Sequence, residues 1–319
     1  MPLLGDEYIH ALYYMKKQSI FSIALDYLNR FGACVKARSF DLLWIEKELF
    51  PWLPALAERF LYRSRIPYVV DYDDAVYHRY NLHRDPIIRG LLGKSIDSAM
   101  QHAATVVVGN YYLAEYARRA GARKIEYLPT VVDIDRYPIY ENQSKQFRIG
   151  WIGSPITAPY LGLAKDALDE VCRQTKARMV LIGAGELDPL PGLEKENLPW
   201  SEDSEVANIQ SCDVGIMPLP DEPFTRGKCG YKLVQYMAAG LPVVASPVGI
   251  NTRIVEQGKT GFLASSKEEW VQALVTLYHD AGMRSDMGRA GRQKVEKEYS
   301  LQITAPRLLD ILTKASSSQ

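Results

Sequence analysis

Two lysines lie four residues apart in the segment TRGKCGYKLVQYMAAG, residues 225–240. Lys228 and Lys232 fall where a helix is predicted to begin, and a positive charge in the first helical turn opposes the helix dipole. Like charges at this spacing also repel each other. Gly227 and Gly230 bracket Lys228 and let the backbone approach a ligand closely. The pattern indicates an anion site, most simply for phosphate. The alternative is a solvated helix face with both lysines in water.

A second strand–loop–helix unit lies at residues 149–161, IGWIGSPITAPYL. Its apolar run ends in Gly153 and Ser154, and a helix is predicted to start near Thr157. This loop could cradle a phosphate, and two such cradles could clamp one pyrophosphate. It could also be an ordinary turn with Thr157 as the N-cap. Gly183 ends another apolar run and could admit a nucleotide, but the full GxGxxG pattern of dinucleotide-binding proteins is missing.

Carboxylates gather after an apolar run of the first half, in VVDYDDAVYHRYN at residues 69–81. Asp71 and Asp73 match a DxD pattern, which in some sugar transferases holds a divalent metal, and carboxylates suit Mg²⁺ or Mn²⁺. Alternatively, one aspartate caps the next helix and another pairs with an arginine, Arg79 or Arg84.

Three more polar residues are candidates on the same side of the predicted sheet. Asp74 and His78 belong to the carboxylate cluster, although a single histidine is more often packed or exposed than catalytic. Asn110 follows the next apolar run, and its position favours an N-cap.

Residues 50–65, FPWLPALAERFLYRSR, combine apolar and basic side chains. Such a segment could dock on an anionic membrane surface. The favoured interpretation is a helix of the domain with a basic exposed face.

The composition describes a soluble globular protein of 319 residues, long enough for two domains. Lysine plus arginine equals aspartate plus glutamate at 38 each, which leaves no electrostatic footprint for nucleic acid. The four cysteines have no metal-ligand spacing, which favours scattered thiols in a reducing compartment. The N-terminus lacks the order of a signal peptide, and no run approaches the roughly 18 apolar residues of a membrane span. We therefore expect a cytoplasmic protein.

Short apolar runs alternate with amphipathic stretches along the chain, which predicts parallel sheets with helices on both faces. Strands are expected at 42–46, 68–72, 105–109, 124–128, 147–152, 178–183, 213–218, 242–246 and 261–265. Helices are expected near 54–65, 86–103, 111–120, 160–174, 203–211, 230–239, 266–279 and 300–315. A polar segment without period, 131–146, is interpreted as a linker. The expected fold class is α/β with two doubly wound domains, whose ligands bind beyond the carboxyl ends of the strands.

The second half closely resembles the C-terminal domain of the group 1, or family 4, glycosyltransferases. The resemblance includes DVGIMPLPDEPFTRGKCGYKLVQYMAAGLPVVASPVGINTRIVEQGKTGFLAS at 213–265 and runs from WIGS at 151–154 to GRAGRQKVEKEYS at 288–300. VVDYDDAVYHRY and VVVGN of the first half are similar to the same family more loosely. The resemblance implies the GT-B fold, with two Rossmann-like domains facing a cleft. The domains expected are an acceptor-side domain at 1–140, a donor domain at 147–299, and a C-terminal helix and tail at 300–319.

The resemblance also implies roles for the candidate residues, in a retaining transfer from a nucleotide-sugar donor that needs no metal and no cofactor. Donor contacts are expected from Gly153, Ser154, Gly183, Arg226, Lys228, Lys232 and Gln235. Catalytic roles are expected for Lys228, Lys232, Asp73 and His78, and an acceptor-side position for Asp74 and Asn110. The two lysines would stabilise the charge that develops on the leaving phosphate. Gln235 stands where the family often has a glutamate that binds the donor ribose.

The beginning of the chain departs from the family pattern. A family member would first show a strand, a glycine-bearing loop, a helix and a second strand, whereas this chain begins PLLGDEYIHALYYMKK. We therefore expect an incomplete N-terminal domain.

The expected function is glycosyl transfer to a saccharide or lipid-linked acceptor in polysaccharide or glycolipid assembly, with peripheral association at the inner face of the membrane. A nucleotide-sugar isomerase or hydrolase on the same fold and a non-catalytic binding module remain alternatives. The donor base, the sugar and the acceptor do not follow from the sequence.

Overall fold

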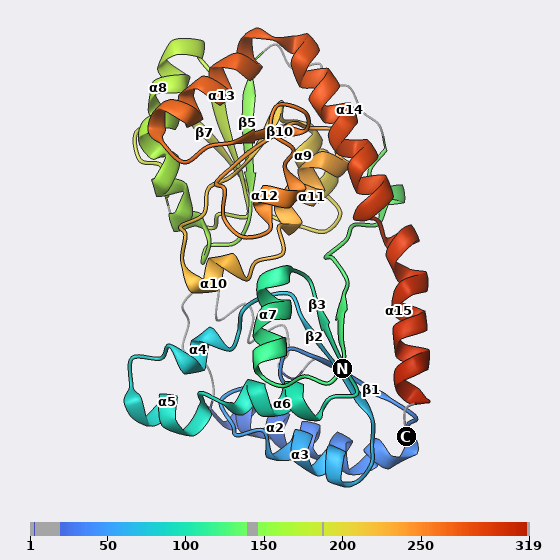
Figure 1. The fold of residues 1–319 in the computed structure, drawn as a ribbon. Helices are drawn as coiled ribbons and strands as arrows, with labels where there is room; N and C mark the ends of the chain where they lie inside the picture. The colour runs from blue at the N-terminus through green and yellow to red at the C-terminus, as the bar shows by residue number, and fades with distance from the viewer. Residues whose placement is uncertain (1–2, 4–19, 139–145, 187, 318–319) are drawn as a thin grey trace. The chain divides into compact units, whose positions relative to one another are not determined.

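Figure 1 shows the computed structural model of the chain, which describes residue 3 and residues 20–138, 146–186 and 188–317. The chain divides into two compact units, each built around its own parallel sheet. The first unit comprises Met1–Pro129, Arg226–Lys228 and Ala305–Gln319, and the second comprises Thr130–Thr225 and Cys229–Thr304.

The sheet of the first unit has four parallel strands that follow one another in chain order. They are β1 (Leu43–Glu46), β2 (Tyr68–Tyr72), β3 (Thr105–Val108) and β4 (Ile125–Tyr127). β3 is buried along its whole length, as expected for a strand covered on both faces. All four predicted strands of the first half are confirmed, to within one residue at either end.

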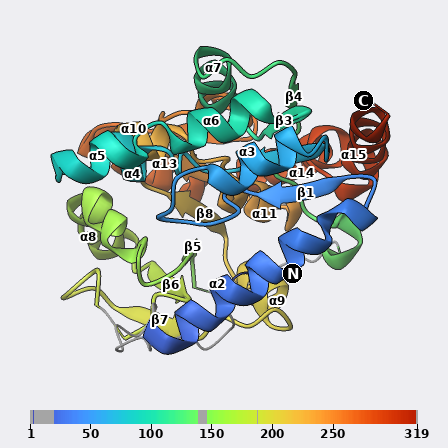
Figure 2. The ribbon, with the colours of Figure 1, turned by 90° about the horizontal axis from the view of Figure 1, so that it is seen from below.

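Helices cover this sheet and extend away from it. They are α2 (Ile20–Val35), the 3-10 helix η1 (Lys36–Ser39), α3 (Leu56–Arg63), α4 (His78–Asn81), α5 (Pro86–Leu92), α6 (Ser95–His102), α7 (Tyr111–Arg119) and most of α15 (Leu301–Ser316). α3 lies beside α6 in Figures 1 and 2. Ile311 and Ala315 of α15 pack with Val69 and Val107 of the sheet. None of the described helices, in either unit, is long and apolar enough to cross a bilayer.

The single helix predicted over 86–103 is wrong, because the structure contains two helices there. Asp85 caps α5 by accepting a hydrogen bond from the amide of Ile87 (2.8 Å). The helix ends at Gly93, where a β-carbon would lie only 2.3 Å from the carbonyl oxygen of Arg89. Glycine is a poor helix former, and here it permits a tight turn before α6 begins.

The sheet of the second unit has six parallel strands in the order β10-β9-β8-β5-β6-β7. They are β5 (Arg148–Ile152), β6 (Arg178–Ile182), β7 (Lys195–Leu198), β8 (Val214–Met217), β9 (Val243–Ala245) and β10 (Gly261–Leu263). Five of them were predicted. β7 was missed because its sequence, KENL, has no apolar run, and as an edge strand it has no fully buried residue.

Two helical layers cover the two faces of the second sheet. The helices along this part of the chain are η3 (Ala158–Ala164), α8 (Lys165–Thr175), α9 (Glu205–Gln210), α10 (Pro223–Arg226), α11 (Tyr231–Ala238), α12 (Asn251–Ile254), α13 (Lys267–His279) and α14 (Ala281–Glu298). Val180 and Ile182 of β6 pack in one buried cluster with Leu233 of α11. The alternate residues of β6, Met179 and Leu181, pack with α8 and α13 in another. This alternation is that of a doubly wound sheet.

The segment interpreted as a linker, 131–146, contains local secondary structure in its described part. Val132 forms a parallel bridge with Ser300, and a 3-10 helix, η2, spans Ile134–Arg136. Asp133 accepts a hydrogen bond from Gln302 (2.8 Å). These residues count with the second unit, and residues 139–145 lie outside the described part of the chain.

Candidate functional site

The order of the strands marks one place in the second sheet as a ligand site. β5 pairs with β6 on one side and with β8 on the other, so the strand order reverses between β5 and β8. Open parallel sheets bind ligands beyond the carboxyl ends of the strands at such a point. The loop that leaves β5 there begins with Gly153 and Ser154.

Lys232 lies against the loop that follows β5. α11 begins after Gly230, whose left-handed φ of 70° suits glycine. The Lys232 ammonium lies 4.3 Å from the ring centre of Trp151 and 3.3 Å from Thr157 Oγ1. Because Trp151 is almost fully buried, this cation–π contact holds the ammonium at the carboxyl end of the sheet. Sequence reasoning missed Trp151 and assigned Thr157 only as an N-cap.

Gly153 and Gly183 make the space for this arrangement. A β-carbon on Gly153 would lie 2.5 Å from the Trp151 ring and 2.6 Å from the Lys232 ammonium. A β-carbon on Gly183, whose φ is +79°, would lie 2.4 Å from the carbonyl oxygen of Gly153. The loops after β5 and β6 therefore lie so close together that neither Gly153 nor Gly183 has room for a side chain.

The amides of the predicted phosphate cradle point elsewhere in this structure. Gly153 donates to the carbonyl of Ile182 (3.0 Å), and Ser154 donates to Thr157 Oγ1 (3.2 Å). Thr157 stands at the N-cap position of η3 but makes no side-chain cap bond, so its predicted capping role is wrong. Two groups beside these amides could meet an anion, the Lys232 ammonium of α11 and the Ser154 hydroxyl of the loop.

Gln235 is a buried amide on α11. It is 2% exposed, and within the described residues its Nε2 makes no hydrogen bond of normal geometry, although it interacts with the Tyr137 hydroxyl as a weak donor. A buried donor left without a full hydrogen bond costs up to about 1–3 kcal/mol, which a ligand oxygen would offset.

Lys228 pairs with the carboxylate of Asp74. Both residues belong to the first unit, which includes the segment Arg226–Lys228. The Lys228 ammonium lies 3.4 Å from Asp74 Oδ1, longer than the roughly 2.7–2.9 Å of a close charge-assisted bond. Burial raises the pKa of Asp74, and the charge of Lys228 opposes that rise. A β-carbon on Gly227 would lie 2.4 Å from that of Ala75, so the loop requires glycine there. Arg226, the last residue of α10, is exposed.

Asn110 positions the Lys228 loop in addition to capping a helix. Its side-chain oxygen accepts from the amide of Leu113 (2.9 Å), which confirms the N-cap of α7. Its Nδ2 donates to the carbonyls of Gly227 (2.8 Å) and Lys228 (3.0 Å). Because Asn110 is 1% exposed, all of these bonds are shielded from water.

The aspartates after β2 pair with lysines and not with the arginines considered above. Asp73 forms an ion pair with Lys47 (2.9 Å), which follows the carboxyl end of β1. Sequence reasoning missed Lys47, although its place directly after a strand was the available signal. Burial first, then the charges of Asp73 and Glu46, raise the pKa of Asp71 to about 7. Within the described residues, no group of three His, Cys, Asp or Glu side chains could hold a metal ion.

His78 is held on both ring nitrogens. Nδ1 lies 2.9 Å from Asn81 Oδ1 and Nε2 lies 2.8 Å from the Tyr112 hydroxyl. Burial lowers the pKa of His78, so the imidazole is neutral at pH 7. Because the Asn81 oxygen only accepts, Nδ1 carries the proton and Nε2 accepts from Tyr112.

The two parallel sheets and the carboxyl-end site define the GT-B class of fold, and solved structures agree. Sucrose-phosphate synthase from Thermosynechococcus elongatus superposes with a TM-score of 0.71 at 15% identity, covering 95% of this chain and 81% of that one. HepE of Anabaena in complex with UDP-glucose gives a TM-score of 0.69 at 16% identity, covering 89% of this chain and 82% of that one. The predicted fold class, α/β with Rossmann-like domains, is confirmed.

The second unit also matches a sequence family. Residues 146–280 match the model of the group 1 glycosyl transferases, which confirms the predicted resemblance over that range. D-inositol 3-phosphate glycosyltransferase of Paenarthrobacter aurescens is 36% identical over 111 residues, 34% of this chain and 26% of that protein. Sulfoquinovosyl transferase SQD2 of Arabidopsis thaliana is 33% identical over 150 residues, 43% of this chain and 28% of that protein. The chain thus covers about a quarter of the length of these relatives.

Proposed function

We propose that this protein is a glycosyltransferase that moves a sugar from a nucleotide-sugar donor to a saccharide or lipid-linked acceptor. The proposal rests on Lys232, whose ammonium lies against Trp151 and beside Gly153. This is the point where the strand order of the second sheet reverses. This arrangement offers a fixed cation at the place where such sheets bind phosphates. It also falls within the residues that match the glycosyltransferase model.

The proposed chemistry uses the two lysines as electrostatic catalysts. As the bond from the sugar to the donor phosphate breaks, negative charge develops on the leaving oxygen. Lys232, and Lys228 four residues before it in the chain, would stabilise that charge more in the transition state than in the ground state. In this proposal the transfer is retaining and needs no metal. Gly183 and Arg226 would contact the donor, and the Nε2 of Gln235 would donate a hydrogen bond to a ribose oxygen.

The acceptor side is proposed to lie after β2 and β3 of the first unit. Asp74 pairs with Lys228 and Asn110 holds the Lys228 loop, so both would link acceptor binding to the catalytic cation. Asp73 and His78 are the proposed catalytic groups of this side. The neutral Nε2 of His78 could take a proton from an acceptor hydroxyl that replaces Tyr112.

A thermal-shift screen without added metal tests the donor site. UDP, GDP, ADP and their sugar derivatives should be compared on the wild type, Lys228→Ala, Lys232→Ala and the exposed control Lys259→Ala. A nucleotide at 100 times its Kd should add about 2.7 kcal/mol of stability. We expect one base to stabilise the wild type and the control, and both site variants to lose the shift. If no nucleotide stabilises the wild type, the proposed function is wrong.

Turnover separates transfer from the other functions that the fold could support. We expect donor cleavage to depend on added acceptor, because the sugar must have a nucleophile to receive it. Donor consumption without acceptor would indicate an isomerase or hydrolase. Donor binding without turnover in any acceptor mixture would indicate a binding module.

We further propose a cytoplasmic location at the inner face of a membrane. Support comes from apolar side chains on the first unit, because Leu56 is 66% exposed and Phe60 is 50% exposed on α3. The described cysteines are free thiols, which suits a reducing compartment. Co-sedimentation with anionic liposomes should fall in Leu56→Ser and Phe60→Ser but not in Leu163→Ser, an equally exposed leucine of the second unit. Equal sedimentation of all four proteins would contradict the proposal.

A further inference from the structure

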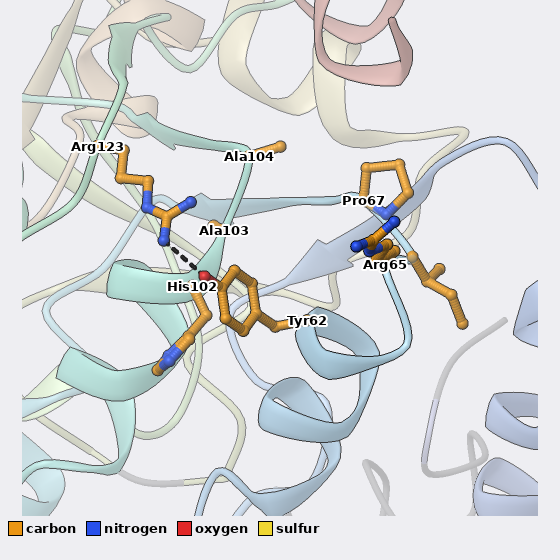
Figure 3. A pocket seen from close by; sticks show the side chains of 8 residues that line it. Tyr62, Arg65, Pro67, His102, Ala103, Ala104 and Arg123 are labelled. Carbon is orange, nitrogen blue, oxygen red and sulfur yellow. Dashed lines mark hydrogen bonds between the residues drawn. The ribbon is translucent and has the colours of Figure 1, made fainter. Parts of the chain in front are cut away.

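A pocket of about 450 Å³ opens on the first unit at the amino ends of its strands (Figure 3). Pro67 precedes β2, Ala103 and Ala104 precede β3, and Arg123 lies two residues before β4. The pocket is thus at the amino ends of these strands, whereas Asp74 and Asn110 follow the carboxyl ends. It belongs to neither of the lysine sites.

The lining of this pocket is basic, aromatic and apolar, and it contains no carboxylate. Arg123 donates to the Tyr62 hydroxyl (2.8 Å), and its guanidinium carbon lies 5.1 Å from the Tyr62 ring centre. The His102 ring also contacts Tyr62, with 4.7 Å between the ring centres and an angle of 63° between the ring planes. Figure 3 shows Arg65 and Pro67 on one side and Arg123 and His102 on the other.

The two arginines of the pocket have no acidic neighbour within ion-pair distance among the residues that the structure describes. This differs from other arginines of the first unit, since Arg79 pairs with Glu48 and Arg118 pairs with Glu115. Two guanidinium groups that face one hollow without a counter-ion attract an anion. Guanidinium forks match the oxygens of phosphate in particular.

Arg65 occupies a position that ordinarily selects glycine. It lies two residues after the last residue of α3, and its amide donates to the Tyr62 carbonyl (3.0 Å). The next amide, of Ile66, donates to the carbonyl of Leu61 (3.0 Å). These two bonds form a Schellman motif, in which the residue with left-handed φ is usually glycine. Arg65 has φ +56° there, a conformation that costs an L-residue energy. Backbone strain of this kind is often found at functional positions, which suggests that the Arg65 side chain has a function.

A hollow of the second unit, lined in part by α14, lacks this feature. It has a volume of about 600 Å³ and contains three arginines. Arg289 already pairs with Asp286, and Arg292 pairs with Glu296 (2.7 Å). Arg284 donates to the carbonyl of Tyr278 (3.0 Å) and to a second carbonyl. These charges are already used within the protein, so the pocket of the first unit is the stronger anion site.

We propose that the pocket lined by Tyr62, Arg65 and Arg123 binds a phosphate monoester. Arg65 and Arg123 hold the phosphate oxygens, and the Tyr62 hydroxyl, which accepts from Arg123, uses its own proton as a third donor. The organic part of the ligand packs on Ile66 and Pro67. Two sources share this chemistry, a small phosphorylated metabolite and the headgroup of an anionic lipid such as phosphatidic acid.

Calorimetric titration with glycerol 3-phosphate, followed by inorganic phosphate, tests the pocket. We expect saturable binding that weakens at least tenfold in Arg65→Gln and in Arg123→Gln. Arg63→Gln, which removes the same charge from an exposed residue outside the lining, should bind like the wild type. Lys232→Ala should also bind normally, so this outcome is independent of the proposed donor site. Equal weakening in Arg63→Gln would mean diffuse electrostatics and would overturn the proposal.

Vesicles distinguish the two sources of the phosphate. Phosphatidylcholine vesicles with and without phosphatidic acid should be compared by co-sedimentation on the same variants. Selective loss in Arg65→Gln and Arg123→Gln assigns the site to a lipid headgroup, whereas binding of soluble esters alone assigns it to a metabolite. Saturable binding in neither assay refutes the pocket.

The variant Arg65→Gly distinguishes a loss of phosphate binding from a loss of folding. Glycine suits φ +56°, so this variant should unfold at a temperature no lower than the wild type while losing affinity at least tenfold. Unchanged affinity in a folded Arg65→Gly protein would also overturn the proposal.

Discussion

Replacing Asp71 by asparagine should change how the stability of the protein depends on pH. Asp71 lies in β2 directly opposite Glu46 of β1, and Asp73 follows two residues later. Burial and these two charges raise the pKa of Asp71 to about 7, from the ordinary value of 3.8. The folded protein therefore holds a proton on Asp71 at pH values where the unfolded chain has released it. By linkage, the free energy of unfolding falls as the pH rises from about 4 to about 7 and stays level above that.

The size of this fall can be worked from the two pKa values. Their difference, 7 minus 3.8, corresponds to about 4 kcal/mol at roughly 1.4 kcal/mol per pH unit. That figure is an upper limit, because Asp71 is only partly shielded from water. We expect about 1–2 kcal/mol between pH 5 and pH 8, since water screens partly exposed charges. Asparagine has the same shape and no charge, so Asp71→Asn should escape the fall.

Urea unfolding of both proteins at pH 5, 6, 7 and 8 provides the assay. Any hydrogen bond lost in Asp71→Asn contributes equally at each pH, so the informative quantity is the change with pH in the stability difference between variant and wild type. Asp41→Asn, at an exposed aspartate just before β1, serves as the control and should give a flat difference. A flat difference for Asp71→Asn, or one that favours the wild type more as the pH rises, would refute the reasoning.

Three further substitutions test the packing around the site by urea unfolding. Gly183→Ala should lower the free energy of unfolding by about 1–3 kcal/mol more than the control Gly192→Ala. Both glycines have positive φ, but only a methyl group at position 183 would meet a backbone carbonyl. Equal losses of stability in the two variants would contradict the close approach of the loops after β5 and β6. Tyr236→Phe should cost about 1–3 kcal/mol, because a fully buried strand amide loses its acceptor at 2.8 Å, and a loss below 0.5 kcal/mol would show that this bond contributes little. Asn110→Asp keeps the N-cap oxygen but loses both bonds to the Lys228 loop, so it should destabilise by about 2 kcal/mol and Asn110→Ala by more; a fully stable Asn110→Asp would show that the loop needs no anchor.

Much of the fold could be predicted because its strands are short apolar runs. The runs YVVDY and TVVVG are buried on both faces, and such runs identify strands whatever their neighbours. β7 could not be found in this way, because an edge strand of sequence KENL carries no apolar signal. The break between α5 and α6 was also not predicted. A glycine within a helical pattern does not always end the helix, and Gly93 does so because the chain turns there.

The candidate site was harder to predict, because its contacts join distant parts of the chain. Although α11 begins only at Tyr231, so that Lys228 lies in the loop before it and not in its first turn, spacing alone placed Lys228 and Lys232 near the start of this helix. It could not show that Lys232 lies over Trp151, because that depends on how α11 packs on the sheet. Asn110 was predicted as a cap from local sequence, but its bond to Gly227 spans 117 residues and has no local signal.

The strand order of the second unit has a consequence for how the site assembles. β5, β6 and β7 form one locally connected half of the sheet, and β8, β9 and β10 form the other. Among the described strands, the two halves are joined by the pairing of β5 with β8. Beside it, the amide of Arg148 donates to the Asp213 carboxylate across 65 residues of sequence. Closing so long a loop is entropically slow. We therefore expect the pairing of β5 with β8 to form after the pairings within each half. A ligand bound over the carboxyl ends of β5 and β8 would slow amide hydrogen exchange most in these two strands. It would stabilise the pairing that joins the two halves of the sheet.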